Sequence, residues 1–141
     1  MFAPYSTFGS RQAMSSAYTR VGVESSVAGG ASPHRLVLML MDGVLEAILQ
    51  ARGAIAARDV EAKGRAIGRA SRILEEGLKA ALDLKSGGEL AHNLHALYTY
   101  VIGRLMHANL HNDEATLLEC QRLLQPVRDA WTEIGAQTLA G

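Results

Sequence analysis

The chain has 141 residues, enough for one domain with a sizeable hydrophobic core and no need of disulfides. Its 14 basic and 14 acidic residues balance, and no long run of like charge provides the footprint that nucleic acid or an anionic membrane requires. The longest apolar run, residues 36–41, cannot span a membrane, and residues 1–30 lack the pattern of a secretory signal. We therefore expect a cytoplasmic protein that binds no nucleic acid and does not insert into membranes.

Residues 1–30 differ in composition from the rest of the chain. Gly, Ser and Ala dominate them, and no helical period is sustained. They nevertheless hold four of the seven aromatic residues, namely Phe2, Tyr5, Phe8 and Tyr18. Because a solvated tail would avoid aromatics, we expect a flexible cap segment over residues 1–30 that lies on apolar surface of the following domain, with an undocked terminus as the alternative. The side chains expected on that surface are Tyr18, Val21, Val23 and Val27.

The first helix has a clear start signal. Ser32 can accept a hydrogen bond from first-turn amides, and Pro33 suits the first helical position, where its missing amide costs nothing. The helix should end near Ala57, and its core face consists of Val37, Leu40, Val44, Ile48, Ala51 and Ile55. A second apolar stripe of Leu38, Leu45 and Leu49 lies beside the polar face, and Met39 falls among the charged residues. These surplus apolar side chains need a cover, either from this chain or from another molecule.

The second predicted helix follows Asp59, which can cap it, and continues to the joint at residues 83–88. Its apolar and small residues keep a seven-residue repeat: Val60, Ile67, Leu74 and Ala81, with Gly64, Ser71 and Leu78. Gly64, Gly68 and Gly77 each cost about 1 kcal/mol relative to Ala inside a helix. Their presence indicates that another backbone or a ligand comes close, and close helix packing is the simpler interpretation.

Two further helices complete the expected fold. Ser86 and Glu89 have the spacing of a capping box, and a core stripe follows to about His111: Leu90, Leu94, Leu97, Val101, Leu105 and Ala108, widened by Tyr98, Ile102 and Met106. Asn112 and Asp113 should cap the fourth helix, whose core positions are Leu117, Cys120, Leu124, Val127, Trp131 and Ile134. Pro126 should bend it near Arg122. The short joints predict an all-α, antiparallel up-down four-helix bundle over residues 31–141.

The sequence offers little for catalysis. His92 with His95, and His107 with His111, can share helix faces, but the pairs lie roughly 20 Å apart and neither has a carboxylate spaced as a third ligand. No histidine has the neighbouring lysine that a phosphoryl carrier would use, and no phosphate-binding glycine loop, nucleophile elbow or zinc spacing occurs. Cys120 lies on the apolar side of its helix, as a buried thiol would. We therefore expect no enzyme, no cofactor and no metal.

Many short motifs in order resemble the FliS family of flagellin export chaperones, over about residues 17–134. They are Ala17-Tyr18, Val23-Glu24-Ser25, Ala31-Ser32-Pro33-His34-Arg35-Leu36, Met41-Asp42-Gly43, Gly77-Leu78-Lys79, Leu82-Asp83, Gly87-Gly88-Glu89-Leu90-Ala91, Asn93-Leu94, Leu97-Tyr98-Thr99-Tyr100, Leu105, Ala108-Asn109 and Ala130-Trp131. Met41 departs from the family pattern, which usually has an aromatic residue before Asp-Gly, and so does Pro126.

The resemblance implies a cytoplasmic type III secretion chaperone. Such a protein binds the disordered C-terminal segment of flagellin, prevents its premature polymerisation and delivers it to a component of the flagellar export gate. An anti-sigma factor or a co-chaperone is a further partner that the resemblance suggests. It also implies that the N-terminal segment, with Tyr18, occupies part of the cargo surface until cargo displaces it. The surplus apolar residues of the first helix agree with this, because flagellin termini form amphipathic helices in the filament.

We expect cargo contacts at the apolar stripe and at nearby polar side chains that could pair with an extended backbone. The candidates are Tyr18, Leu38, Leu45, Leu49, Asn93, Tyr98, Tyr100 and Asn109. For the last four a role in the core or at a helix cap is equally open. The alternative function is a self-assembling helical bundle, a structural or adaptor module without secreted cargo, whose extra apolar stripe closes a homodimer. A weak homodimer is also compatible with the chaperone.

Overall fold

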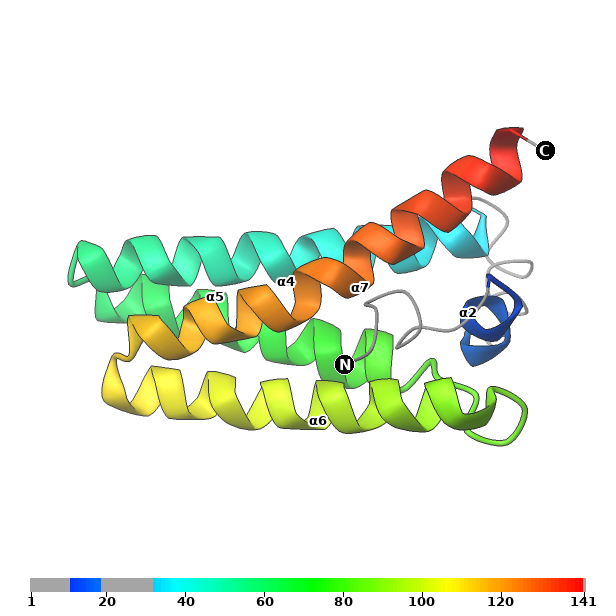
Figure 1. The fold of residues 1–141 in the computed structure, drawn as a ribbon. Helices are drawn as coiled ribbons and strands as arrows, with labels where there is room; N and C mark the ends of the chain where they lie inside the picture. The colour runs from blue at the N-terminus through cyan, green and yellow to red at the C-terminus, as the bar shows by residue number, and fades with distance from the viewer. Residues whose placement is uncertain (1–10, 19–31, 141) are drawn as a thin grey trace, which may run out of the picture.

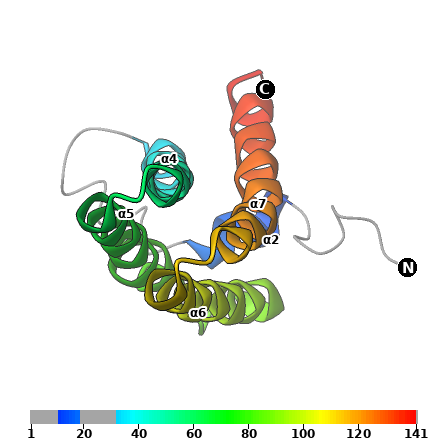
Figure 2. The same cartoon turned by 90° about the vertical axis from the view of Figure 1, so that its left-hand side faces the viewer.

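The computed structural model describes residues 11–18 and 32–140, and all regular structure in these residues is helical. The elements are α2 (Arg11–Ala17), α4 (Pro33–Ala56), α5 (Val60–Arg72), the π-helix η1 (Ile73–Lys79), α6 (Gly88–His111) and α7 (Glu114–Ala140). Because η1 continues α5 directly, four long helical rods surround one core (Figures 1 and 2). The predicted all-α four-helix bundle is confirmed. Phe2, Tyr5, Phe8, Val21, Val23 and Val27 lie outside the described residues.

Three of the predicted helix starts are confirmed by capping hydrogen bonds. The Ser32 hydroxyl accepts from the Arg35 amide at 3.1 Å, and Pro33 opens α4. Asp59 Oδ1 accepts from the Ala62 amide at 3.0 Å at the start of α5. Asp113 Oδ1 accepts from the Thr116 amide at 3.2 Å at the start of α7. Each cap satisfies a backbone donor that the first helical turn leaves without an intrahelical partner.

The predicted capping box at Ser86 and Glu89 is wrong. α6 begins at Gly88, and its N-cap residue Gly87 makes no side-chain capping bond. Asp83 organises this loop instead, because its Oδ1 accepts from the amides of Lys85 and Ser86 at 3.1 and 2.9 Å. An Asp that bonds amides two and three residues ahead stabilises a turn, and this turn competes with the capping box for Ser86.

The core follows the predicted stripes with a few exceptions. All four helices contribute fully buried aliphatic side chains, among them Val37, Ile48, Leu74, Leu94, Leu105 and Leu117. Leu40, Ile55 and Leu97 are only half-buried at the edge of the core. Val60 and Met106 were expected in core stripes but are both 66% exposed. Val60 is the first residue of α5, so it lies beyond the end of the packed interface.

The second rod differs from the prediction in its last turns. Residues 73–79 form a π-helix, which the sequence pattern does not signal because Leu74 and Leu78 are buried at a spacing that suits an α-helix equally well. The interpretation of the glycines holds only for Gly77, where an added Cβ would come within 3.2 Å of Leu40. It is wrong for Gly64, which has no neighbour within 4 Å, and for Gly68, which faces only the end of the Arg72 side chain.

α7 continues through Pro126 as one helix. Figures 1 and 2 show that it changes direction in its middle and that its C-terminal half diverges from α6. A proline removes the amide that would bond the carbonyl four residues earlier, here that of Arg122, so the predicted bend has its expected cause. The bend directs the turn that carries Trp131 toward the start of α4.

Within the described part of the N-terminal segment, Arg11–Ala17 form a helix, although the sequence of residues 1–30 sustains no helical period. α2 packs against α6 at one end of the bundle (Figure 1). Met14 and Ala17 are fully buried and Tyr18 is 3% exposed. Their spacing of i, i+3 and i+4 defines one helical face, a signal too short to distinguish from chance in the sequence. The Asp83 amide donates to the Ala17 carbonyl at 2.9 Å and so ties α2 to the loop before α6.

We expect Gly87→Ala to destabilise the protein by about 1–3 kcal/mol, because there is no space for a side chain at this position. An added Cβ would lie 2.4 Å from the Asp83 carbonyl oxygen, 2.6 Å from the Ala91 Cβ and 3.0 Å from the Ala17 Cα. Gly64→Ala is the control and should stabilise by about 0.5–1 kcal/mol, since its Cβ meets nothing within 4 Å. Urea unfolding measures both, and equal stabilities of the two variants would contradict this packing.

Candidate functional site

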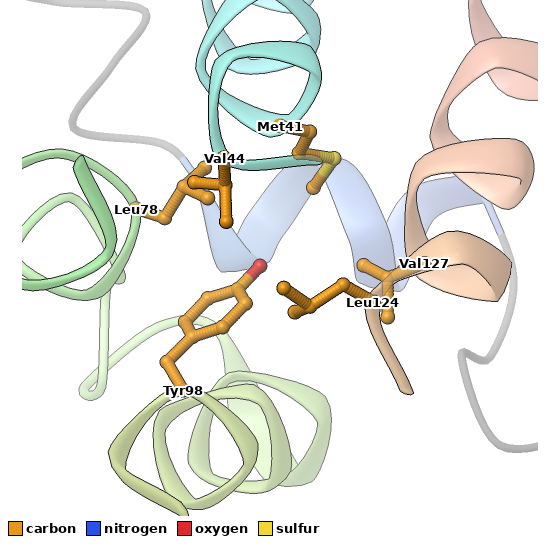
Figure 3. Close-up of a pocket in the computed structure, with 6 residues that line it drawn as sticks. All are labelled: Met41, Val44, Leu78, Tyr98, Leu124 and Val127. Carbon is orange, nitrogen blue, oxygen red and sulfur yellow. The ribbon is translucent and has the colours of Figure 1, made fainter. Parts of the chain in front are cut away.

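Tyr18 and Tyr98 form a buried hydroxyl pair where α2 meets the bundle. Their oxygens are 2.5 Å apart, and Tyr98 is fully buried. Figure 3 shows the Tyr98 hydroxyl directed from α6 into the centre of the bundle, toward apolar side chains of the other three rods. These side chains enclose a cavity of about 10 Å³ and are Met41, Val44, Leu78, Leu124 and Val127. In this apolar environment Tyr18 supplies the hydrogen-bond partner that the Tyr98 hydroxyl needs.

Both phenols remain neutral at physiological pH. Burial raises the pKa of Tyr18 well above its usual value, and the neighbouring Tyr98 raises it further. Burial also raises the pKa of Tyr98, although the hydrogen bond to Tyr18 acts in the opposite direction. Because neither hydroxyl ionises, the hydrogen bond between Tyr18 and Tyr98 does not change with pH near neutrality.

Besides Tyr98, Tyr18 contacts Trp131 of α7. The two rings meet edge to face, with centroids 5.4 Å apart. Trp131 also stacks on His34 at the start of α4, with centroids 5.0 Å apart and planes inclined by 7°. Its Nε1 donates to the His34 carbonyl at 2.8 Å, and His34 Nε2 lies 2.5 Å from the Trp131 carbonyl. Tyr18 therefore rests on an aromatic group that holds α4 and α7 together.

The apolar stripe predicted on α4 is partly uncovered. Leu38 and Leu45 are half-buried against the core, whereas Leu49 is 60% and Met39 55% exposed. Polar contacts from the same helix to α7 flank this stripe: Arg128 Nε lies 2.7 Å from Asp42 Oδ1, and Arg52 Nε 2.6 Å from Glu114 Oε2. The exposed leucine and methionine take no part in these contacts, so they are available to another molecule.

The polar candidates lie on α6. Asn93, Tyr100 and Asn109 are exposed, and the Tyr100 hydroxyl donates to Glu119 at 2.6 Å. α4 and α6 lie on opposite sides of the bundle axis in Figure 2, so a segment that contacted both sets would have to wrap around the molecule. The structure thus joins Tyr18 to Tyr98 and places the three leucines on one helix. It does not bring these two groups together with the α6 residues into one patch.

Three residues at the end of the bundle where α2 packs were not predicted as site residues: Met14, His34 and Trp131. Met14 shares a helical face with Ala17 and Tyr18, but three positions are too few to identify that face from the sequence. His34 and Trp131 could not be paired from the sequence, because each bonds a backbone carbonyl of the other and such bonds leave no trace in residue types.

The described residues contain no group of three or more His, Cys, Asp or Glu side chains that could hold a metal ion. Cys120 is buried against the backbone of Val101, and burial raises the pKa of its thiol to about 12, so it is no reactive thiolate. Among the helices that the structure describes, none is long and apolar enough to cross a membrane.

Comparison with known proteins identifies the family. The family model described as flagellar protein FliS matches residues 14–138. The chain belongs to the FliS family. The FliS match begins at Met14 and therefore includes most of α2. FliS proteins are chaperones rather than enzymes, and this FliS chain is accordingly a chaperone of flagellar secretion.

Curated FliS relatives cover most of the chain. It is 48% identical over 118 residues to the flagellar secretion chaperone FliS of Salmonella typhimurium, a match that covers 84% of this chain and 87% of the relative. It is 46% identical over 117 residues to flagellar secretion chaperone FliSB of Pseudomonas aeruginosa, covering 83% and 91%. The FliS of Escherichia coli is 43% identical over 117 residues, covering 83% and 85%. The family match over residues 14–138 contains α4, α5, η1 and α6 in full and all but the last two residues of α7.

Proposed function

We propose that this chain acts in the cytoplasm, where it binds the disordered C-terminal segment of flagellin, prevents its premature polymerisation and delivers it to the flagellar export gate. The observation that carries the proposal is the bound state of α2. This short helix and Tyr18, the residue after it, bury Met14, Ala17 and Tyr18 on the bundle, at the i, i+3, i+4 spacing of the face that an amphipathic helix of another protein would present. The contact of α2 with the bundle supports the proposal because an amphipathic helix of cargo could occupy the same surface.

The apolar stripe of α4 extends the proposed cargo surface. Leu38 and Leu45 give it a half-buried floor, and Leu49 adds exposed apolar area beside them. Asn93, Tyr100 and Asn109 would pair with backbone groups of a segment that continues around to α6. Flagellin whose apolar face is covered in this way cannot use that face to polymerise. The same contact would therefore keep flagellin soluble and prevent its premature polymerisation.

In this proposal residues 1–30 act as a cap that competes with cargo. Tyr98 becomes a cargo contact only after Tyr18 leaves, because in the capped state its hydroxyl is buried against that of Tyr18. A cap that closes the surface for part of the time lowers the apparent affinity by that fraction, and it would promote cargo release at the export gate.

The test is a calorimetric titration with full-length monomeric flagellin and with flagellin that lacks roughly its last forty residues, a length sufficient for a wrapped disordered segment. Tight one-to-one binding with a large negative heat-capacity change, lost on truncation, is the expected result. Absence of binding to both forms would refute the proposal and leave a self-assembling bundle as the better explanation.

We expect Leu49→Glu to weaken flagellin binding about tenfold with little change in folding, because a charge would replace an exposed apolar contact. Val60→Glu is the matched control: Val60 is also a large exposed side chain, at 66% compared with 60% for Leu49, but it lies on α5, which carries no residue of the proposed cargo surface. The affinity of this control variant for flagellin should stay within about twofold of that of the parent protein. Equal losses in the two variants would show that the α4 stripe has no special role.

A further inference from the structure

A second pocket lies at the end of the bundle opposite α2. The turn between α4 and α5 and the turn between α6 and α7 meet at this end (Figure 1). The pocket has a volume of about 380 Å³, and its lining residues are Ala54, Ile55, Arg58, Asp59, Val60, Lys63 and Asn112. Pockets of roughly 300–1,000 Å³ hold small ligands or a few side chains of a partner. None of the residues assigned to the proposed cargo surface lines it.

Lys63 places a buried positive charge in the wall of this pocket. The residue is only 5% exposed. Its ammonium group donates to the Asn109 carbonyl at 2.8 Å and to Asn112 Oδ1 at 2.5 Å, and within the described residues it has no ion pair. Both acceptors are neutral and lie at the C-terminal end of α6, where the helix dipole favours a cation. A desolvated ammonium that makes no ion pair with a described residue is suited to receive a carboxylate.

The rim adds a second cation and apolar surface. Arg58 is exposed in a left-handed turn conformation, with φ 57°, and makes no ion pair with any described residue. Asp59 is the one acidic lining residue, and its Oδ1 is engaged with the Ala62 amide as the cap of α5. Val60 is 66% exposed beside Ile55, so the pocket joins an uncovered apolar patch to a net positive charge. This combination suits a ligand that is apolar and anionic at once.

We propose that this pocket docks a peptide segment of a partner protein in which an acidic residue stands beside a large aliphatic one. The aliphatic side chain contacts Ile55 and Val60, and the carboxylate pairs with Arg58 and approaches Lys63. The pocket lies at the opposite end of the bundle from α2, so such a partner does not compete with α2 for its place on the bundle. The inference goes beyond the proposed function, because it holds whether or not the bundle binds flagellin.

The test is an NMR titration of the full ¹⁵N-labelled chain with the peptide acetyl-Ala-Leu-Glu-Ala-amide and with its Gln analogue. The Glu peptide should shift amide signals of residues 54–63 and 112 and bind about tenfold more tightly than the Gln peptide, since only a carboxylate can pair with the cations. Equal affinities, shifts confined to another face, or no shift at millimolar peptide would overturn the proposal.

Two variants that preserve the fold sharpen this test. Arg58→Gln removes the cation at the rim of the pocket. Val60→Glu puts a negative charge in the first turn of α5, where the helix dipole favours it. That charge repels the carboxylate of the peptide. Both should weaken binding of the Glu peptide at least about fivefold. Arg65→Gln is the matched control, because Arg65 is exposed on α5 and does not line the pocket. A loss of the same size in the control would contradict a specific site.

Discussion

Trp131→Ala should lower the free energy of unfolding by about 3–5 kcal/mol, the largest loss expected from a single substitution in this chain. The indole belongs to α7, is 4% exposed and contacts two other parts of the chain: it stacks on His34 of α4 and meets Tyr18, the residue after α2. The substitution leaves a cavity at the joint of these elements, and the His34 carbonyl loses the donor that reaches it at 2.8 Å. Chemical unfolding followed by far-ultraviolet circular dichroism measures the change.

Trp131→Phe separates packing from hydrogen bonding at the same site. Phenylalanine keeps a ring against Tyr18 and His34 but has no Nε1 donor, so we expect a smaller loss of about 1–3 kcal/mol. If Trp131→Ala cost less than about 1 kcal/mol, the aromatic group would not hold α4 and α7 together as the structure indicates.

Tyr18→Ala should increase the apparent affinity for the flagellin C-terminal segment about ten- to hundredfold, because it removes the side chain that keeps the cap in place. Without the phenol, α2 loses its contacts with Tyr98 and Trp131 and keeps chiefly the burial of Met14 and Ala17. The cost in stability should stay at about 1–3 kcal/mol, since a short terminal helix can detach without unfolding of the bundle. Calorimetric titration with the isolated segment measures the affinity.

Tyr18→Phe is the matched control for the cap. It preserves the ring contact with Trp131 but leaves the buried Tyr98 hydroxyl without its partner, which costs about 1–3 kcal/mol. Its gain in affinity should therefore lie between those of the parent protein and Tyr18→Ala. An affinity that does not change when Tyr18 is replaced by Ala would show that the cap and the cargo use different surfaces.

The sequence predicts the bundle well because its signals are local. Caps such as Ser32, Asp59 and Asp113 act within three residues, and the apolar periods of the helices repeat often enough to be read. The predicted local structure is wrong where the same residues are compatible with two kinds of local structure. At the start of α6 a turn organised by Asp83 replaces the capping box, and in η1 the spacing of the leucines suits two helix types.

The candidate site was harder to predict because it depends on contacts across the fold. Tyr18 and Tyr98 are 80 residues apart in the chain, and His34 and Trp131 are 97 apart. The sequence indicates that Tyr18 adheres to something and that α4 has surplus leucines, but it does not show which of them meet. The sequence does not identify Lys63 as a site residue. Its side chain is buried because it packs against the end of α6, and that contact depends on tertiary packing alone.

Hydrogen exchange over residues 11–18, measured by mass spectrometry with and without the bound flagellin C-terminal segment, tests most directly whether cargo replaces the cap. Displacement of α2 predicts that exchange of residues 11–18 becomes faster when the segment binds, while residues 37–55 of α4 become more protected. The core of α6, around the fully buried Leu105, serves as the internal reference. Binding of the segment with unchanged or increased protection of residues 11–18 would contradict the displacement of the cap.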